Sequence, residues 1–511
     1  MTIGVRVVVD VERTLGAIDN RVYGTLAEHI GRVVYGGLYD PDSPLADAEG
    51  MRTDVLAALR EMAPGMIRWP GGNFASGYHW RDGVGPVADR PGRHDLAWDV
   101  FEPNTFGTEE FLSLCRKVGA QPYLAVNAST GSIDEAQGWL EYCNGRHPVP
   151  EVKLREAGPH PAPHEVKIWG IGNENYGFWQ HLHTDARSMA ELTREWGKLL
   201  YWADSSIEIV GVGAPIADWN WQMLTQAGRS MDFLSMHFYW TALKSDPYHS
   251  LLASPICSER TIQGLWGMAL EAQRMLGLKR PVRIAVDEWG VWNDSGDGLR
   301  EAMADLSHAM RFGLTPKAGV ENSFEEFYDV KDALAVATWF HVMWRHPEKI
   351  AMAAYSMAVN TIAPLFVSEH GLVKQTTFFP LSLAKQHSFG TALDVLVLTD
   401  SGVPAMVAGA AGLGGHNGLL AEDSIAVVDA AGTTDGSRVH LSLVNRSRDE
   451  EIVVTLSGVA GEAHRILLYH DDPFAKNTPD APTTVAPVED RVDVAGSIVL
   501  PPHSHTTLVF R

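Results

Sequence analysis

The sequence predicts an α/β protein with a (β/α)8 barrel followed by an antiparallel, jelly-roll-like β-sandwich. Three observations support this fold class. Between about residues 20 and 365, strand-like runs alternate with helix-like runs, and there are eight strand candidates, the number that closes a barrel. After about residue 365 the helical period disappears, and short alternating runs follow, separated by turn clusters. At 511 residues, the chain also exceeds the usual size of one hydrophobic core.

The predicted barrel strands are short runs rich in β-branched and apolar residues, bounded by turn residues. They are Val22–Glu28, Met66–Pro70, Pro122–Asn127, Val166–Gly172, Ile207–Gly213, Asp232–Tyr239, Arg283–Glu288 and Ala351–Asn360. Helices with one apolar face are predicted at Met51–Met62, Glu109–Val118, Ser188–Trp202, Thr261–Leu276 and Val330–Trp344. The alternation favours parallel strands, because parallel neighbours need long right-handed crossover connections. A doubly wound open sheet would also alternate, but no glycine-rich phosphate turn follows the first strand.

The sandwich is predicted from runs that alternate with a period of two. They are Val395–Leu398, Ile425–Val428, Val439–Val444, Ile452–Leu456, Arg465–Tyr469, Val492–Val494 and Thr506–Phe510. The isolated strand Val5–Asp10 precedes the barrel, and we expect it to pair with the sandwich. The expected division is therefore residues 1–17 for this strand segment, 18–365 for the barrel and 366–511 for the sandwich. Ala408–Leu413 and Pro479–Pro487 are predicted surface loops.

Composition excludes several functional classes. A net charge of −22 repels nucleic acid and anionic lipid, so we expect neither as a partner, and neutral substrates fit better than anionic ones. No run approaches the roughly 18 apolar residues that a membrane span requires. The three cysteines are too few for a disulfide framework, and the N-terminus has no secretory pattern. A cytoplasmic protein is the simplest expectation.

Two stretches place a glutamate at the end of a predicted strand. Lys167–Asn175 carries Glu174 beside Asn173, and Ile284–Gly290 carries Glu288 before a tryptophan. In a barrel, the carboxyl ends of the fourth and seventh strands face each other across the mouth. A single strand-end glutamate is more often solvated or ion-paired, but two at matching places indicate the paired carboxylates that hydrolyse a glycosidic bond.

Other strand ends carry residues that suit such a site. Arg68, before the Pro-Gly-Gly turn and Asn73, could keep a nucleophilic carboxylate ionised, and a phenol such as Tyr239 could donate a hydrogen bond to it. Taken alone, a turn and core aromatics would be the better explanation of these residues. Three tryptophans fall in loops that should lie at the barrel mouth, where their faces could contact sugar rings or simply close a core. They are Trp98, Trp179 and Trp292.

A metal site is not expected. His181 and His183 form a His-x-His pair, but no carboxylate or third histidine stands at a matching spacing.

Taken together, these motifs resemble those of the family 51 glycoside hydrolases, the α-L-arabinofuranosidases. The matching segments are Tyr23–Arg32, Val34–Tyr39, Arg68–Tyr78, Asp82–Pro86, Trp169–Tyr176, His237–Tyr239 and Asp287–Trp292. The resemblance runs through the barrel and more loosely into the sandwich. It implies a retaining hydrolase that acts on non-reducing terminal α-L-arabinofuranosyl groups, without metal or organic cofactor, and that is homo-oligomeric.

The resemblance also implies roles for single residues. Glu174 would be the acid/base and Glu288 the nucleophile. Sugar-hydroxyl ligands would be Glu28, Asn73 and Asn173, Tyr239 would orient the nucleophile, Arg68 and His237 would support the carboxylates, and Trp98 and Trp292 would line the rim.

Two segments depart from the common family pattern. Asn175–Trp179 follows the acid/base where members often carry Met-Asp-Gly or Asn-Trp-Gly, and Thr361–Pro364 lacks a glutamine found in some members. The resemblance therefore leaves the linkage and leaving group open. The alternatives are another glycosidase of the same clan, such as an endoglucanase or xylosidase, and a carbohydrate-binding protein without catalysis. Retention of both glutamates argues against the second.

Overall fold

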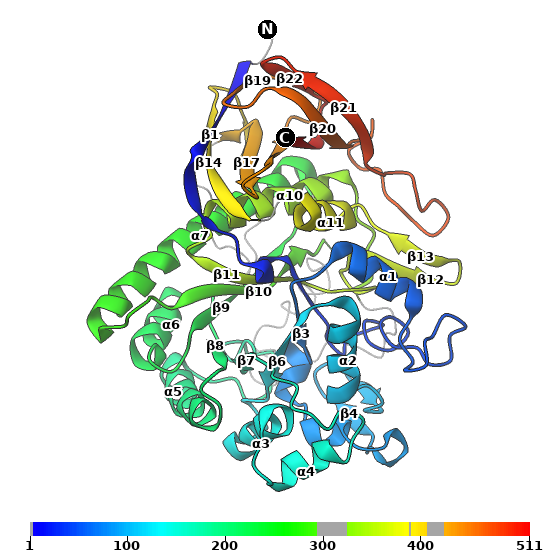
Figure 1. Ribbon diagram of the computed structural model, residues 1–511, viewed down its shortest axis with the longest axis vertical. Coiled ribbons are helices and arrows are strands. Elements are labelled where there is room, and N and C mark those ends of the chain that lie inside the picture. The colour runs from blue at the N-terminus through cyan, green and yellow to red at the C-terminus, as the bar shows by residue number, and fades with distance from the viewer. Residues whose placement is uncertain (1–3, 294–323, 388–389, 406–423) are drawn as a thin grey trace.

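The computed structural model describes residues 4–293, 324–387, 390–405 and 424–511, which form a closed barrel beneath a C-terminal sheet (Figure 1). Every strand of the barrel is parallel to its neighbours, in the order β10-β11-β2-β3-β6-β7-β8-β9. The strands are β2 (Gly24–Leu26), β3 (Met66–Trp69), β6 (Gln121–Val126), β7 (Ile168–Ile171), β8 (Glu208–Gly211), β9 (Phe233–Trp240), β10 (Arg283–Val291) and β11 (Ile350–Tyr355). Each lies within or overlaps one of the predicted runs, so the predicted barrel is confirmed.

Helices surround the barrel and return the chain to the start of the next strand. They are α1 (Thr53–Met62), α2 (Thr108–Val118), α3 (Ile133–Asn144), α4 (Pro150–Glu156), α5 (Ala186–Ala203), α6 (Ala217–Gln222), α7 (Pro247–Leu276) and α10 (Val330–Arg345). Helix α7 begins earlier than the predicted Thr261, because its first turns are buried on several sides and show no amphipathic period. Within the described residues, no helix is both long and apolar enough to cross a lipid bilayer.

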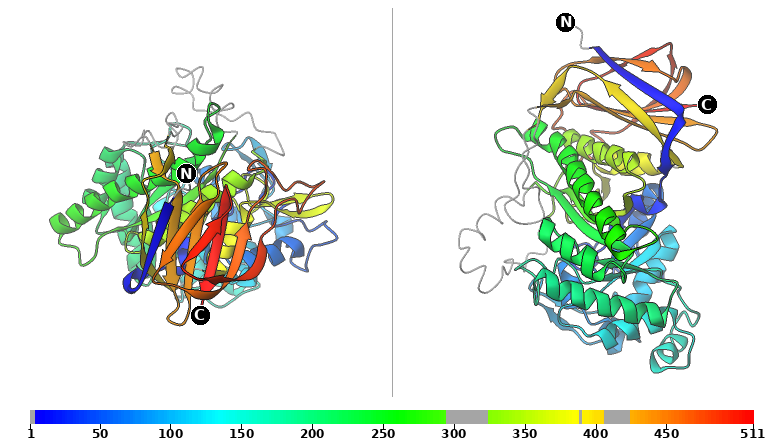
Figure 2. Two further views of the ribbon diagram at one scale, coloured as in Figure 1. Left: turned by 90° about the horizontal axis from the view of Figure 1, so that it is seen from above. Right: turned by 90° about the vertical axis from the view of Figure 1, so that its left-hand side faces the viewer.

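The C-terminal sheet has nine strands and is mostly antiparallel, which confirms the predicted fold class (Figure 2). Its order is β21 (Val488–Val494), β20 (Gly461–Leu468), β23 (Ser504–Phe510), β18 (Val439–Asn445), β17 (Val428–Thr434), β14 (Thr391–Leu398), β1 (Gly4–Ala17), β19 (Ile452–Ser457) and β22 (Ser497–Leu500). The N-terminal strand β1 pairs antiparallel with β14 and parallel with β19. Alternate residues of these strands, such as Val7, Leu441 and Val454, share one buried core.

The segment between barrel and sheet contains a helix that the sequence does not predict. The antiparallel pair β12 (Leu365–Ser368) and β13 (Gly371–Lys374) is followed by α11 (Phe378–His387). The expectation that helices end near residue 365 is therefore wrong. The sequence does not reveal α11 because this helix is buried over most of its length and has no polar face to mark a helical period. Two short antiparallel strand pairs complete the described structure: β4 (Arg93–Asp95) with β5 (Val100–Glu102), and β15 (Gly402–Pro404) with β16 (Ser424–Ala426). The predicted loop Ala408–Leu413 lies outside the described residues.

Helix α10 joins the barrel to the sheet through buried polar groups. On its side of the interface, Arg345 donates from Nε and Nη2 to both carboxylate oxygens of Glu259 on α7 and from Nη1 to Asp429 on β17. His341 Nδ1 lies 3.0 Å from the other oxygen of Asp429. Burial raises the pKa of Asp429, but the charges of Arg345 and Arg446 outweigh it and hold this pKa far below its ordinary value. The cations of the interface therefore keep Asp429 ionised.

Two further side chains extend this network into the sheet. His341 Nε2 lies 2.7 Å from the Ser442 hydroxyl, which lies 2.8 Å from Nε2 of His505. Since the Nδ1 of His341 donates to Asp429, its Nε2 accepts from Ser442, and the Ser442 oxygen accepts from His505. Burial lowers the pKa of His505 to about 3, and repulsion adds to this effect where His341 is also protonated. His505 is therefore neutral throughout the working pH range of most proteins.

The interface predicts a pH dependence of stability. Unfolded His505 takes up a proton near pH 6.5 whereas the folded state does so only near pH 3, so folding stability should fall as pH drops between these values. His505→Gln, whose amide can still donate to Ser442, should flatten this decline, by on the order of 2–4 kcal/mol at most. Urea denaturation midpoints at pH 7.5 and 4.5 measure the effect. His464→Gln, at a more exposed position of the sheet, is the control, and an equal flattening in the control would contradict the account.

Candidate active site

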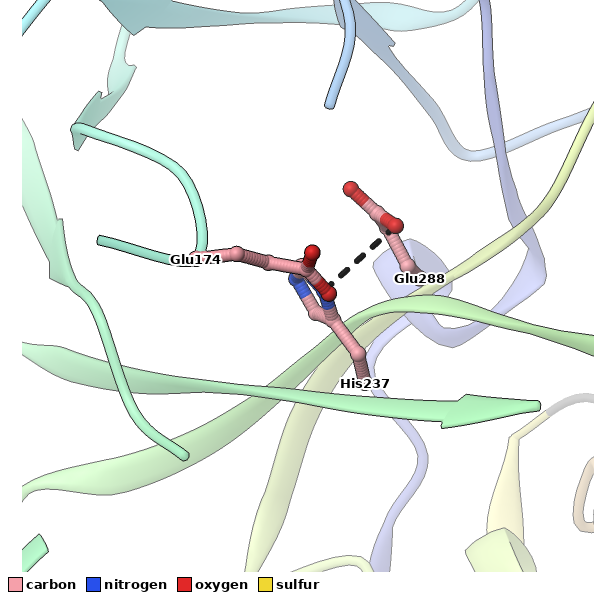
Figure 3. Close-up of side chains that lie close together, drawn as sticks. All are labelled: Glu174, His237 and Glu288. Atoms are coloured by element: carbon pink, nitrogen blue, oxygen red, sulfur yellow. Dashed lines mark hydrogen bonds and ion pairs between the residues drawn. The ribbon is translucent and has the colours of Figure 1, made fainter. Parts of the chain in front are cut away.

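Side chains from the carboxyl ends of five barrel strands converge on one site. They are Glu28 after β2, Arg68 on β3, Asn173 and Glu174 after β7, His237 and Tyr239 on β9, and Glu288 on β10. Figure 3 shows Glu174 and Glu288 approaching each other with the His237 ring beside both. One carboxylate oxygen of Glu174 lies within 4.8 Å of one oxygen of Glu288.

Glu288 is held by a buried arginine and a phenol. Arg68, only 1% exposed, donates from Nη1 to Glu288 Oε1 at 2.5 Å and from Nη2 to Asn173 Oδ1 at 2.7 Å. The Tyr239 hydroxyl donates to Glu288 Oε2 at 2.8 Å. Burial and the charge of Glu288 raise the pKa of Tyr239 well above its ordinary value, so the phenol stays protonated and remains a donor. Glu288 is therefore oriented through both of its oxygens.

Asp287 is a site residue that the sequence reasoning missed. Its side chain lies 3.6 Å from Arg68 Nε and accepts hydrogen bonds from Tyr123 and Ser235. On a regular strand, consecutive side chains point to opposite faces. The register of β10 shifts across Asp287 in its pairing with β9 and with β11, which lets Asp287 and Glu288 approach the same arginine. Burial raises the pKa of Asp287, and the charge of Arg68 outweighs it, lowering this pKa to about 2.

Glu174 accepts three hydrogen bonds. His237 Nδ1 lies 2.7 Å from Oε1, the Tyr176 hydroxyl donates to Oε1 at 3.2 Å, and Trp179 Nε1 donates to Oε2 at 2.7 Å. The backbone of Glu174 has a φ of 46°, a left-handed conformation that non-glycine residues adopt rarely and that recurs at functional sites. Burial raises the pKa of Glu174, but the hydrogen bond and charge of His237 outweigh it, helped by the other two donors, so this pKa lies below its ordinary value.

His237 connects the two glutamates electrostatically. Its Nδ1 lies 2.7 Å from Glu174 and 3.4 Å from Glu288, and its Nε2 lies 3.4 Å from Asp287. Burial lowers the pKa of His237, but the charge of Glu288 and the bonds to Asp287 and Glu174 raise it to about 10. Glu174, His237 and Glu288 have the geometry of a three-ligand cluster, yet a protonated imidazole donates hydrogen bonds and has no lone pair for a metal. The cluster is therefore better suited to holding a proton.

Glu28 lies beside the nucleophile candidate in an unusual state. Its Oε1 accepts from the Phe74 backbone N–H and from Trp98 Nε1, each at 3.0 Å. Burial and the negative charge of Glu288 raise the pKa of Glu28 to about 7. A Cβ at Gly72 would lie 2.9 Å from Glu288 Oε1 and 3.1 Å from Glu28 Oε2, so only glycine leaves these oxygens accessible.

Asn173 offers an unused donor at the same place. Its Nδ2 is buried and has no hydrogen-bond partner among the described residues, although its Oδ1 is held by Arg68. The position where a Gly72 Cβ would stand is 3.6 Å from this Nδ2 and close to both Glu28 and Glu288. A donor and two acceptors thus surround one small space, which is the pattern that a sugar hydroxyl requires.

Aromatic side chains form the walls of the site. Trp292 packs edge to face on Tyr239 and on Phe324, and Trp98 packs edge to face on the same Phe324. On the side of Glu174, Trp179 packs edge to face on Tyr176. The three predicted tryptophans therefore all lie in ring clusters that contact the carboxylates, at opposite sides of the pair.

The remaining predicted residues are more peripheral. Asn73 accepts a hydrogen bond from Gln180, which lies in the same loop as Trp179. His181 packs against Gly77, and His183 is exposed. In the described part of the chain, the one group with three close metal-ligating atoms is Glu174, His237 and Glu288, and the His-x-His pair does not belong to it.

Five contributors to the site escaped the sequence reasoning. They are Asp287, Tyr123, Ser235, Tyr176 and Gln180. Tyr176 and Gln180 stand close to Glu174 in sequence, so their position was a usable signal. Tyr123 and Ser235 are single polar residues in apolar strands, and only their distance to Asp287 reveals a role.

Comparison with known proteins places these features in a family. Residues 58–250 match the model of the α-L-arabinofuranosidase 1 domain, and residues 287–504 match that of the α-L-arabinofuranosidase C-terminal domain. The chain is 33% identical to α-L-arabinofuranosidase C of Emericella nidulans over 97% of this chain and 95% of that protein. It is 34% identical to intracellular exo-α-(1→5)-L-arabinofuranosidase 1 of Bacillus subtilis over 77% of each chain.

The fold agrees with a solved structure of the same family. A family 51 α-L-arabinofuranosidase from Bifidobacterium longum matches with a TM-score of 0.88 and 29% identity, covering 100% of both chains. The likeness therefore extends over barrel and sheet together. With full-length relatives at this level of identity, the chain belongs to the α-L-arabinofuranosidases of glycoside hydrolase family 51, glycosidases that remove arabinofuranosyl residues.

Proposed function

We propose that the protein removes arabinofuranosyl groups from the non-reducing ends of oligosaccharides by double displacement, with Glu288 as nucleophile and Glu174 as acid/base. The observation that carries this proposal is the separation of the two carboxylates, whose nearest ligand atoms lie within 4.8 Å. Retaining glycosidases hold their carboxyl groups about 5–5.5 Å apart, whereas inverting enzymes need about 6.5–9.5 Å to admit a water.

The arrangement of donors supports these roles. In the first step, Glu288 attacks the anomeric carbon while the bond to the leaving oxygen breaks and Glu174 gives that oxygen a proton. Arg68 and Tyr239 hold Glu288 in position for this attack. In the second step, Glu174 takes a proton from water, the water oxygen attacks the anomeric carbon and Glu288 leaves as a carboxylate.

His237 links the two steps through charge. While Glu288 is ionised, its charge favours a proton on the pair formed by His237 and Glu174, whose Nδ1 and Oε1 lie 2.7 Å apart, and this proton is the one that Glu174 gives to the leaving oxygen. Once Glu288 has become a neutral glycosyl ester, its charge no longer favours a proton on this pair, and Glu174 is the carboxylate that takes a proton from water in the second step. The charge of the nucleophile thus affects the protonation of the acid/base through a single imidazole.

Differences in burial support action at chain ends. The side chain of Glu288 is 6% exposed and that of Glu174 is 13% exposed, and Glu28 and Asn173 are also buried. The sugar that contacts Glu28, Asn173 and Glu288 is enclosed. The leaving group departs on the more open side of Glu174. An endo-acting glycosidase of the same clan would need open space on both sides of the carboxylate pair.

The cellular location and the natural substrate are proposed from one relative and from the cysteines. The Bacillus subtilis relative is named an intracellular exo-acting enzyme, and the three cysteines of this chain are buried. We therefore propose a cytoplasmic, homo-oligomeric enzyme that trims short arabinan-derived oligosaccharides and uses no metal or organic cofactor.

The roles of the two glutamates predict different chemistry in their alanine variants. Glu174→Ala should keep much of its glycosylation rate on a dinitrophenyl α-L-arabinofuranoside, which needs no acid, and lose it on an arabino-oligosaccharide. Azide should then speed turnover and give a glycosyl azide of retained configuration. Glu288→Ala should lose activity on both substrates, and any azide product should be inverted. Chromatography and NMR of the azide products measure the outcome.

The control is the matching dinitrophenyl β-D-xyloside, which neither variant nor the parent enzyme should hydrolyse efficiently. Exchange of the two outcomes between the variants would reverse the assignment of roles. Full activity of both variants on the oligosaccharide would place the catalytic pair elsewhere.

The raised pKa of Glu28 predicts that replacing this residue increases stability but lowers activity. Because its folded pKa of about 7 exceeds the ordinary 4.5, its ionisation costs stability progressively as pH rises between these values. Glu28→Gln should therefore be more stable than the parent at pH 8, and kcat/KM should fall about 30-fold or more because a hydrogen bond to substrate is weakened. Thermal unfolding and initial rates at pH 8 test both.

Glu102→Gln provides a matched control for this prediction. Glu102 is also buried, but His29 holds its pKa below the ordinary value despite the opposing effect of burial. Its replacement should lower stability at pH 8. A loss of stability in both variants would contradict the assigned state of Glu28.

A further inference from the structure

Both carboxylate oxygens of Glu174 are already hydrogen-bonded. Oε1 accepts from His237 and Tyr176, and Oε2 accepts from the indole N–H of Trp179 at 2.7 Å. A general acid must present one oxygen to the glycosidic oxygen of its substrate, at a hydrogen-bond distance of about 2.6–3.2 Å. Each carboxylate oxygen has two acceptor sites, so Oε1 is filled by its two donors, and Oε2, which has one donor, is the oxygen that can contact the glycosidic oxygen.

The geometry identifies the donor on this oxygen. The imidazole nitrogen that contacts Oε1 also lies 3.4 Å from Glu288, so Oε1 is on the side of the nucleophile. Oε2 has a single donor, Trp179, which comes from the loop between β7 and α5. The rings of Tyr176 and Phe178 pack edge to face on Trp179, and their centroids lie 5.8 Å and 5.2 Å, respectively, from the Trp179 ring centroid.

The indole can take this position because residue 177 is a glycine. A Cβ at Gly177 would lie 2.3 Å from Trp179 Cε2, so the ring can pack on this loop only because residue 177 has no side chain. The sequence of this loop is also one of the two places where the chain departs from the common family pattern. A substitution at Gly177 therefore displaces the ring without altering the indole itself.

We propose that the indole N–H of Trp179 bonds Glu174 from the side on which the sugar ring of the leaving group lies, and that this ring displaces the indole from Glu174. This inference rests on the proposed function of Glu174 as the acid/base. Trp179 is then a positioning residue. While bonded it stabilises the carboxylate; its departure frees Oε2 and raises the proton affinity of Glu174, the two changes that a general acid needs.

The proposal distinguishes ligands by whether they extend past Glu174. Free arabinose fills only the enclosed space beside Glu28 and Glu288 and should leave the indole in place. An S-linked arabinofuranosyl disaccharide, which is not hydrolysed readily, also places a second sugar ring on the side of Glu174. The displaced indole can then offer its face to that ring.

Indole ¹⁵N–¹H NMR of the full-length protein tests this directly. The Trp179 signal is assigned among the 16 tryptophans by its absence in Trp179→Phe. Arabinose should leave its position unchanged, whereas the S-linked disaccharide should shift it away from the hydrogen-bonded position. An unchanged signal with bound disaccharide, or an equal shift with arabinose, would overturn the proposal.

Inhibition constants provide a second readout. Trp179→Phe removes the competing N–H but keeps an aromatic ring, so the S-linked disaccharide should bind about tenfold more tightly, since a hydrogen bond to a charged group no longer has to be broken. Arabinose should bind unchanged. Gly177→Ala, with its melting temperature checked, should shift disaccharide binding in the same direction. Weaker disaccharide binding in Trp179→Phe would mean that the N–H contacts the ligand, which overturns the proposal.

The matched control is Trp202→Phe, at a tryptophan that is 71% exposed on α5, and it should change neither constant. Failure of the proposed function would look different. In that case, neither arabinose nor the disaccharide would bind, and no aryl arabinofuranoside would be hydrolysed by the parent enzyme.

Discussion

The site depends on the ion pairs and hydrogen bonds of one buried guanidinium group, that of Arg68. Glu28, Glu174, Asp287 and Glu288 place four carboxyl groups in a small, largely buried space, where unpaired charges would be very costly. Arg68 bonds Glu288 and Asn173 and lies 3.6 Å from Asp287, so one cation orients groups from the ends of two strands, β7 and β10. The shifted register of β10 makes this possible, because a regular strand could not direct both Asp287 and Glu288 at one arginine.

The charge that Arg68 leaves uncompensated determines the proton positions. His237 takes up a proton because Glu288, Asp287 and Glu174 surround it, whereas Glu28, which has no ion pair with any described residue, shares a proton with solvent near neutral pH. Sugar recognition and catalysis are thus electrically coupled, since the charge of Glu288 contributes to the pKa of both groups. The Asn173 Nδ2 donor, which has no partner among the described residues, and the Oε2 oxygen of Glu28 lie beside the same Gly72.

Much of this organisation was predictable from the sequence, for identifiable reasons. Alternating runs located all eight barrel strands, and strand-end chemistry pointed to Glu174 and Glu288, because both signals are local. Helix α11 and the first turns of α7 were missed because burial on several sides removes the amphipathic period. The role of Asp287 depends on a bulge, and the bond from Trp179 depends on the missing side chain of Gly177. Neither of these leaves a periodic trace in the sequence.

Double displacement at Glu288 is the central claim, and the anomeric configuration of the first product tests it most directly. Time-resolved ¹H NMR during hydrolysis of an α-L-arabinofuranoside separates the initial sugar from its slower equilibration in water. The account predicts that α-arabinofuranose appears first, because two inversions at a carboxylate pair about 5 Å apart restore the configuration. Initial release of the β anomer would mean a single displacement by water, which would contradict the role of Glu288 as nucleophile.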